Sequence, residues 1–81
     1  MKDLILKDII EQDHKYYMNT FGNRIPVCFT HGDGIYLFGT DQKRYMDLLG
    51  GIAVNVLGHN NKRLVAAICQ QASCLIHCSN L

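Results

Sequence analysis

Apolar residues recur every three to four positions near both ends of the chain, which is the spacing of an amphipathic helix. We expect a first helix over residues 3–17, with Asp3 as its N-cap, and a second over residues 62–73, with Asn60 or Asn61 as its N-cap. The apolar stripes of the two helices are Leu4, Ile5, Ile9 and Ile10, and Leu64, Val65, Ile68, Cys69 and Ala72. Each helix should therefore pack through one face.

Three short runs rich in aromatic and branched residues lie between these helices, at residues 27–30, 35–38 and 44–49. Residues 31–34 and 39–43 separate the runs and carry the glycine and aspartate that are typical of turns. This order predicts a three-stranded antiparallel meander, and the whole chain is then α+β: helix, meander, helix. We expect one face of the third strand to be wetter than the other.

An apolar stretch, residues 52–57, follows Gly50-Gly51 and is interrupted only by Asn55. It leads directly into the start of the second helix. A buried connection is the simpler interpretation, and the wall of a ligand pocket is the functional one. His59, just after this stretch, is expected to be a hydrogen-bonded structural histidine and not a catalytic one.

Composition narrows the class of protein. The chain has 81 residues, of which 48% are apolar and 19% charged, and its formal net charge is +1. These values predict a folded protein with no nucleic-acid or membrane partner. The first residues are too acidic and interrupted for a secretory signal, so we expect a cytoplasmic protein. The apolar stretches exceed the needs of so short a monomer, which indicates part of a larger assembly.

The cysteines offer a possible metal site, which the spacing disfavours. Cys28, Cys69, Cys74 and Cys78 are expected to be reduced and structural in a cytoplasmic protein. Cys69 and Cys74 are five residues apart, about 500° around a helix, so they face different directions. The sequence has no CxxC pair. A zinc module remains a minor alternative, and it predicts one stoichiometric metal ion.

Residues 51–59 carry the motif Gly-Ile-Ala-Val-Asn-x-Leu-Gly-His, and the segments around it fit the same pattern over nearly the whole chain. These segments are Gly34-Ile35-Tyr36-Leu37-Phe38, Asp41 and residues 43–50. The pattern resembles the N-terminal region of class III aminotransferases, most of all the branch that acts on acetylornithine and succinylornithine. Two positions depart from that family: Gln42 replaces a glycine, and Asn61-Lys62 replaces His-Pro. We expect Gln42 to alter its turn and Asn61 to cap the helix instead.

The resemblance implies a parent enzyme of α/β fold type I that uses pyridoxal 5'-phosphate (PLP). It implies that residues 1–81 are an N-terminal segment of the small domain leading into the large domain, with no complete catalytic domain. The parent would be a homodimer that moves an amino group from N-acetylornithine to 2-oxoglutarate in arginine biosynthesis. The substrate pocket would be lined by Ile52, Ala53, Val54, Asn55, Ser79 and Asn80.

The lysine that holds the cofactor lies far downstream in that family. Lys43 is expected in a turn and Lys62 at a helix start, so neither is a candidate for it. The alternative function is a stand-alone interaction module that dimerises or docks through the apolar faces of its helices, without catalysis.

We predict that the isolated chain has no transaminase activity and forms no aldimine with PLP, because the resemblance places the required lysine outside it. The test is an absorption spectrum of the purified chain with and without PLP. A cofactor-dependent band at the usual aldimine wavelength would contradict this expectation.

Overall fold

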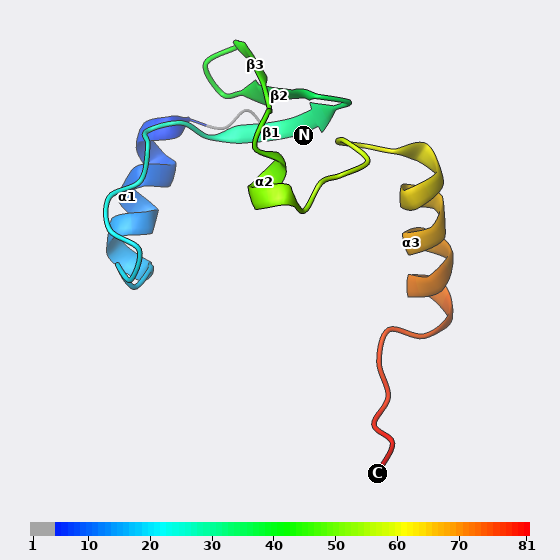
Figure 1. Cartoon of the computed structure of the whole chain (residues 1–81). Coiled ribbons are helices and arrows are strands. Elements are labelled where there is room, and N and C mark those ends of the chain that lie inside the picture. Colours follow the sequence, from blue (N-terminus) through cyan, green and yellow to red (C-terminus); the bar gives the residue numbers. More distant parts are fainter. Residues whose placement is uncertain (1–4) are drawn as a thin grey trace.

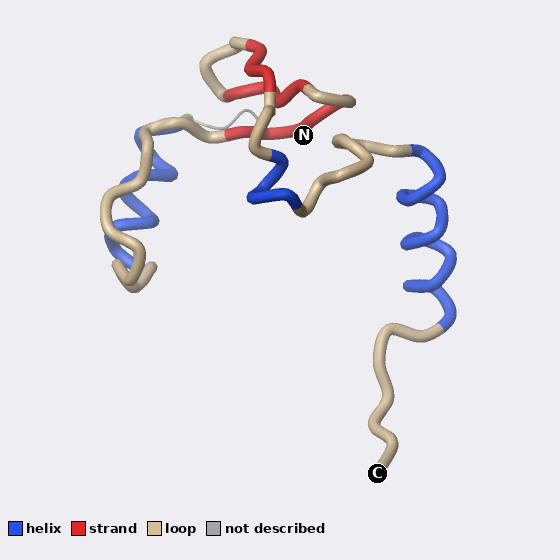
Figure 2. Tube along the Cα trace, viewed as in Figure 1, coloured by secondary structure: helices blue, strands red, loops and turns tan. Residues whose placement is uncertain are grey.

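A computed structural model describes residues 5–81 as three helices and one small sheet (Figure 1). In chain order the elements are α1 (Leu6–Tyr16), β1 (Phe29–Asp33), β2 (Tyr36–Gly39), β3 (Arg44–Met46), α2 (Gly50–Ala53) and α3 (Lys62–Cys74). Figure 2 shows how much of the path between the helices and strands is loop. The predicted order of helix, meander and helix is confirmed, and α2 is an addition that the pattern did not predict.

The sheet is an antiparallel meander with the strand order β1-β2-β3, as predicted. The first strand begins later than predicted and continues through residues 31–33, which we had expected to form the turn. Asp33 pairs with Tyr36, so the chain reverses at Gly34 and Ile35 instead. The His31 ring stacks on the Phe38 ring with 4.5 Å between centroids, and this cross-strand contact favours the longer strand.

The third strand is shorter than predicted, because pairing with β2 ends at Met46. Its exposure alternates as expected: Tyr45 is half-buried, whereas Arg44 and Met46 are exposed. Tyr45 packs edge-on against Phe29 of β1 and donates a hydrogen bond to Asp41. Gln42, in the same turn, keeps a positive φ of 65° although it is not glycine. We had expected the replacement of glycine by Gln42 to alter this turn, but φ at this position remains positive.

The two long helices match their predicted positions. α3 begins at Lys62, and the Asn61 side chain accepts a hydrogen bond from the Leu64 N–H at 3.0 Å, so the cap predicted at this position is confirmed. α1 follows Ile5, which makes no side-chain cap. The predicted cap Asp3 and the first stripe residue Leu4 lie outside the described residues.

The described chain has an open shape. α1 and α3 lie on opposite sides of the sheet in Figure 1, and among the described elements only the strands contact one another extensively. The radius of gyration is 16.1 Å, against about 12 Å for a compact domain of this length. No described hydrophobic side chain is buried. A conventional hydrophobic core is therefore absent from the described residues.

The exposed area supports the same conclusion. The surface is 7656 Å², whereas a folded monomer of this size exposes about 4,900 Å². The excess is on the order of 2,700 Å², several times the roughly 800 Å² that one partner buries in a standard interface. The α3 stripe is part of it, with Leu64 45% and Ile68 58% exposed. These faces have the apolar composition of a protein interior, but no described segment packs against them.

We predict that the isolated chain self-associates and unfolds without a sharp thermal transition, because its apolar faces have no partner among the residues that the structure describes. Sedimentation velocity at two concentrations and circular dichroism on heating would measure both properties. A concentration-independent monomer with one cooperative transition would contradict this account of the fold.

Candidate functional site

The residues predicted to line a substrate pocket fall in two separate places. Four of them, residues 52–55, lie in α2 or directly after it, and Ser79 and Asn80 lie in the extended tail that follows α3. The tail runs away from the sheet and from α2 (Figure 1). The described chain therefore does not bring the two groups together, and their role in a pocket stays a prediction.

The apolar stretch of residues 52–57 is exposed, so its interpretation as a buried connection is wrong within the described chain. Ile52 is 80% exposed and Val56 81%. The physical reason is that no described segment packs over this stretch: α1 and α3 both lie elsewhere. An apolar surface that the chain leaves open is available to line a cavity with another part of a protein.

α2 is a left-handed turn, not an ordinary helix. All four residues from Gly50 to Ala53 have positive φ, and Gly51 and Ile52 have ψ values of 36° and 63°. Left-handed backbone costs an L-residue roughly 1–2 kcal/mol, and a β-branched residue such as Ile52 rarely adopts it. The backbone nevertheless closes the turn, because Ala53 N–H donates to the Leu49 carbonyl at 3.0 Å. Strain of this kind is concentrated at functional sites.

One carboxylate holds the entry to this turn. Oδ1 of Asp47 accepts hydrogen bonds from the backbone N–H groups of Gly50, at 2.8 Å, and Leu49, at 3.2 Å. Oδ2 accepts a hydrogen bond from Nε2 of His59 at 2.7 Å. The side chains of Asp47 and His59 are 11% and 19% exposed, so water competes little for these bonds. We call these two residues and their hydrogen bonds the Asp47–His59 clamp.

The backbone of His59 is fixed as well. Gly34 and His59 form an isolated antiparallel bridge, with N–O distances of 3.0 and 2.7 Å. A Cβ at Gly32 would lie 2.6 Å from the His59 Cβ, and one at Gly58 would lie 2.9 Å from the Gly34 oxygen. Gly58 also has φ +77°, which disfavours any other residue. The close approach of the β1–β2 hairpin to His59 therefore depends on these glycines.

The clamp shapes the titration of its carboxyl group. The Gly50 N–H, and after it His59, lower the pKa of Asp47 below its ordinary value of 3.8, because both donate to the ionised form. The prediction that His59 is a hydrogen-bonded structural histidine is confirmed by the same geometry. Each carboxylate oxygen accepts at least one hydrogen bond, so this arrangement orients the backbone of the turn and the imidazole of His59.

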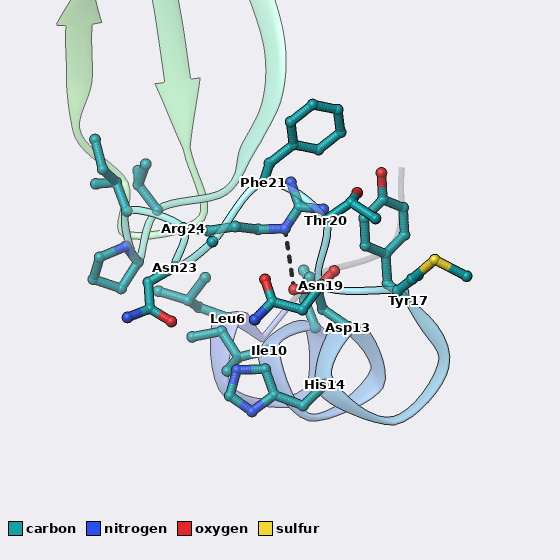
Figure 3. Close-up of a pocket in the computed structure, with 16 residues that line it drawn as sticks. Leu6, Ile10, Asp13, His14, Tyr17, Asn19, Thr20, Phe21, Asn23 and Arg24 are labelled. Carbon is teal, nitrogen blue, oxygen red and sulfur yellow. Dashed lines mark hydrogen bonds and ion pairs between the residues drawn. The ribbon is translucent and has the colours of Figure 1, made fainter.

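A pocket of about 780 Å³ lies elsewhere, between α1 and the loop of residues 17–27 (Figure 3). Ile10 belongs to its apolar side. On its polar side Arg24 pairs with Asp13 at 3.1 Å, and the guanidinium lies over the Tyr17 ring at 4.6 Å. None of the six residues predicted to line a substrate pocket belongs to it. The pair already satisfies the charge of Arg24, so we assign no ligand here.

Neither the lysines nor the potential metal ligands among the described residues gather into a site. Lys43 lies in the exposed turn before β3 and Lys62 begins α3, and no lysine lines the pocket of Figure 3. Within residues 5–81, no three His, Cys, Asp or Glu side chains converge on one point as metal ligands do. Three of the four free cysteines are exposed, which does not fit the expected structural role: Cys69, Cys74 and Cys78. No described helix has the length and apolar character needed to cross a bilayer.

Comparison with known proteins places these observations in a family. The class III aminotransferase family matches residues 17–81, so the chain belongs to that class. Members of this class use PLP. The structure is also similar to acetylornithine aminotransferase from Elizabethkingia anophelis, with a TM-score of 0.85 and 27% identity over 93% of this chain and 18% of that one.

Two further relatives are informative. Acetylornithine aminotransferase 1 of Bordetella pertussis is 55% identical over 58 residues, which are 72% of this chain and 15% of that protein. A taurine:2-oxoglutarate aminotransferase from Bifidobacterium kashiwanohense, solved in complex with PLP and glutamate, has a TM-score of 0.80 and 26% identity. That match covers 99% of this chain and 18% of the other. The chain therefore spans less than a fifth of each of these three relatives.

The clamp is the feature that analysis of the sequence missed. The sequence predicts a hydrogen-bonded structural role for His59 but does not identify Asp47 as its partner. The sequence did contain a signal for half of the clamp. An aspartate side chain often accepts hydrogen bonds from the backbone N–H groups two and three residues later, as Asp47 does from Leu49 and Gly50. Its pairing with His59, twelve residues away, depends on the hairpin and could not be derived from spacing.

We predict that Asp47 titrates below 3.8 in the folded protein and that His59→Phe raises its pKa toward that value by removing one donor. A depressed pKa means that the clamp contributes fully above pH 3.8 and is lost as the pH falls through the folded value. The carboxyl carbon shift of Asp47, followed by NMR, measures this directly. An unchanged midpoint in His59→Phe would contradict the role given to the imidazole.

Proposed function

We propose that this chain serves as the N-terminal segment of a PLP-dependent transaminase that moves an amino group from N-acetylornithine to 2-oxoglutarate, in arginine biosynthesis. The observation that carries the proposal is the intact stretch of residues 51–59, within a chain that is 55% identical over 58 residues to an acetylornithine aminotransferase. The chain would form part of the small domain and lead into the large domain of a cytoplasmic homodimer.

In this proposal the segment supplies shape and not chemistry. The left-handed turn would present Ile52 and Ala53 to the amino donor, and Val54 and Asn55 would continue that wall. Ser79 and Asn80 would reach the same pocket from the tail once the rest of the enzyme surrounds it. Apolar walls exclude water from a reaction centre and so strengthen the electrostatic interactions inside it. The cofactor and its lysine would belong to the remainder of the enzyme.

The exposed faces support this assignment. The rest of an aminotransferase subunit and its partner subunit would cover the α3 stripe and the stretch after α2. The same exposed area also supports the second candidate, a stand-alone module that docks on a partner without catalysis. The two differ in one respect: only a transaminase segment should work inside a transaminase.

The test is a graft. Residues 17–81 replace the corresponding segment of the Bordetella pertussis enzyme named above, and transamination of N-acetylornithine with 2-oxoglutarate is measured. We expect the activity of the graft to lie within about tenfold of the unmodified recipient enzyme. A tenfold loss corresponds to about 1.4 kcal/mol of transition-state stabilisation. A graft that folds and binds PLP but has no activity would contradict the proposal and favour the docking module.

The pocket wall is tested in the active graft by Ile52→Ala. We expect the KM for the amino donor to rise by about tenfold, because apolar contact with the substrate is lost. Ile25→Ala is the matched control, since Ile25 is 81% exposed against 80% for Ile52 but lies in the loop beside α1. Equal KM values for the two variants would remove Ile52 from the pocket wall.

A further inference from the structure

We propose that Asp47 and His59 are positioning residues for the reaction: the clamp holds the left-handed turn of α2 and so aims Ile52 and Ala53 at the amino donor. The inference rests on the proposed function, because that function makes this turn part of the substrate pocket. It adds two residues that the pocket assignment does not contain. Neither residue is proposed to touch the substrate.

The first argument is that hydrophobic packing among residues 5–81 does not hold the turn. Ile52 is 80% exposed and Val54 is 73% exposed, and neither is covered by a described helix. Ile52 and Ala53 are consecutive and neither is glycine, yet they have φ values of 60° and 61°. A strained backbone persists only where its surroundings determine it strongly. Among the described residues, hydrogen bonds are therefore the contacts that fix this backbone.

The second argument is where those hydrogen bonds lie. Asp47 fixes the entry to the turn through the Gly50 N–H at 2.8 Å. His59 stands at the exit of the same segment, held by its backbone bridge to Gly34. The bond of 2.7 Å between the two side chains joins entry to exit. The segment from 48 to 58 is thus a loop closed at its base, which restricts the directions in which its side chains can point.

The third argument is that the clamp transmits the position of the sheet. Asp47 follows β3, and its N–H donates to the Ile35 carbonyl at 2.6 Å. The bridge between Gly34 and His59 ties the exit to the hairpin between β1 and β2. Both ends of the turn are therefore fixed to one rigid element, and rigid support is what a substrate-lining side chain requires.

The experiment compares two Asp→Asn substitutions in the active graft. Asp47→Asn retains the size of the side chain but replaces one acceptor oxygen with a donor group, so the two-sided clamp is broken. Asp41→Asn is the matched control, because Asp41 likewise accepts from a backbone N–H and from a side chain, Tyr45, in the β2–β3 turn. We expect Asp47→Asn to raise the KM for N-acetylornithine about tenfold, with kcat and bound PLP nearly unchanged.

The substitution of His59 provides a rescue test. His59→Gln keeps an N–H group that can donate to Asp47, so we expect its KM for N-acetylornithine to stay close to that of the unsubstituted graft. His59→Phe keeps a planar ring but has no donor, so we expect a KM close to that of Asp47→Asn. A purely structural role predicts instead that stability and PLP content fall in both variants while the KM stays constant.

Hydrogen exchange of the backbone N–H groups of residues 50–55 provides a readout that does not depend on activity. It should accelerate in Asp47→Asn and remain unchanged in Asp41→Asn. If both variants show the same exchange and the same KM, the inference is overturned. If the unsubstituted graft folds but is inactive, the proposed function fails, and the exchange difference alone then decides whether the clamp holds the turn.

Discussion

The hydrogen bonds of the Asp47 carboxylate are the interaction on which the central part of this structure depends. They start the left-handed turn at Gly50 and tie its exit to His59, which in turn meets the β1–β2 hairpin. Asn61, two residues after His59, then caps α3. A short polar network thus fixes how the chain leaves the sheet, and the last helix starts directly after it. Such networks specify one arrangement when every member is satisfied, as both oxygens of Asp47 are.

Hydrophobic burial contributes little to the order of the described residues. The described residues form elements with apolar faces, yet no apolar side chain among them is buried. The sheet and the clamp therefore give local order, and the free energy of burial is left for contacts outside the chain. This division is what we expect if the chain, as proposed, shares its interior with the rest of a class III aminotransferase.

Much of the fold was predictable because it is local. Short runs of aromatic and branched residues predicted the meander, the stripe from Leu64 predicted α3, and Asn61 was expected to cap it. The turn at Gly50–Ala53 was not predictable, since Ile52 has a strong preference against positive φ. The exposure of residues 52–57 was not predictable either, because an apolar stretch normally indicates burial. The resemblance supplies the predicted pocket residues, whereas the clamp needed the three-dimensional structure.

The most direct test of the central claim is the size of the native product that carries these residues. An antibody raised against residues 17–81 would isolate it from the source cells, and mass spectrometry of the intact protein would measure its length. If the segment shares its interior with a transaminase body, the product should be several-fold longer than 81 residues and should carry PLP on a lysine outside them. A product that consists of these 81 residues alone would contradict the claim.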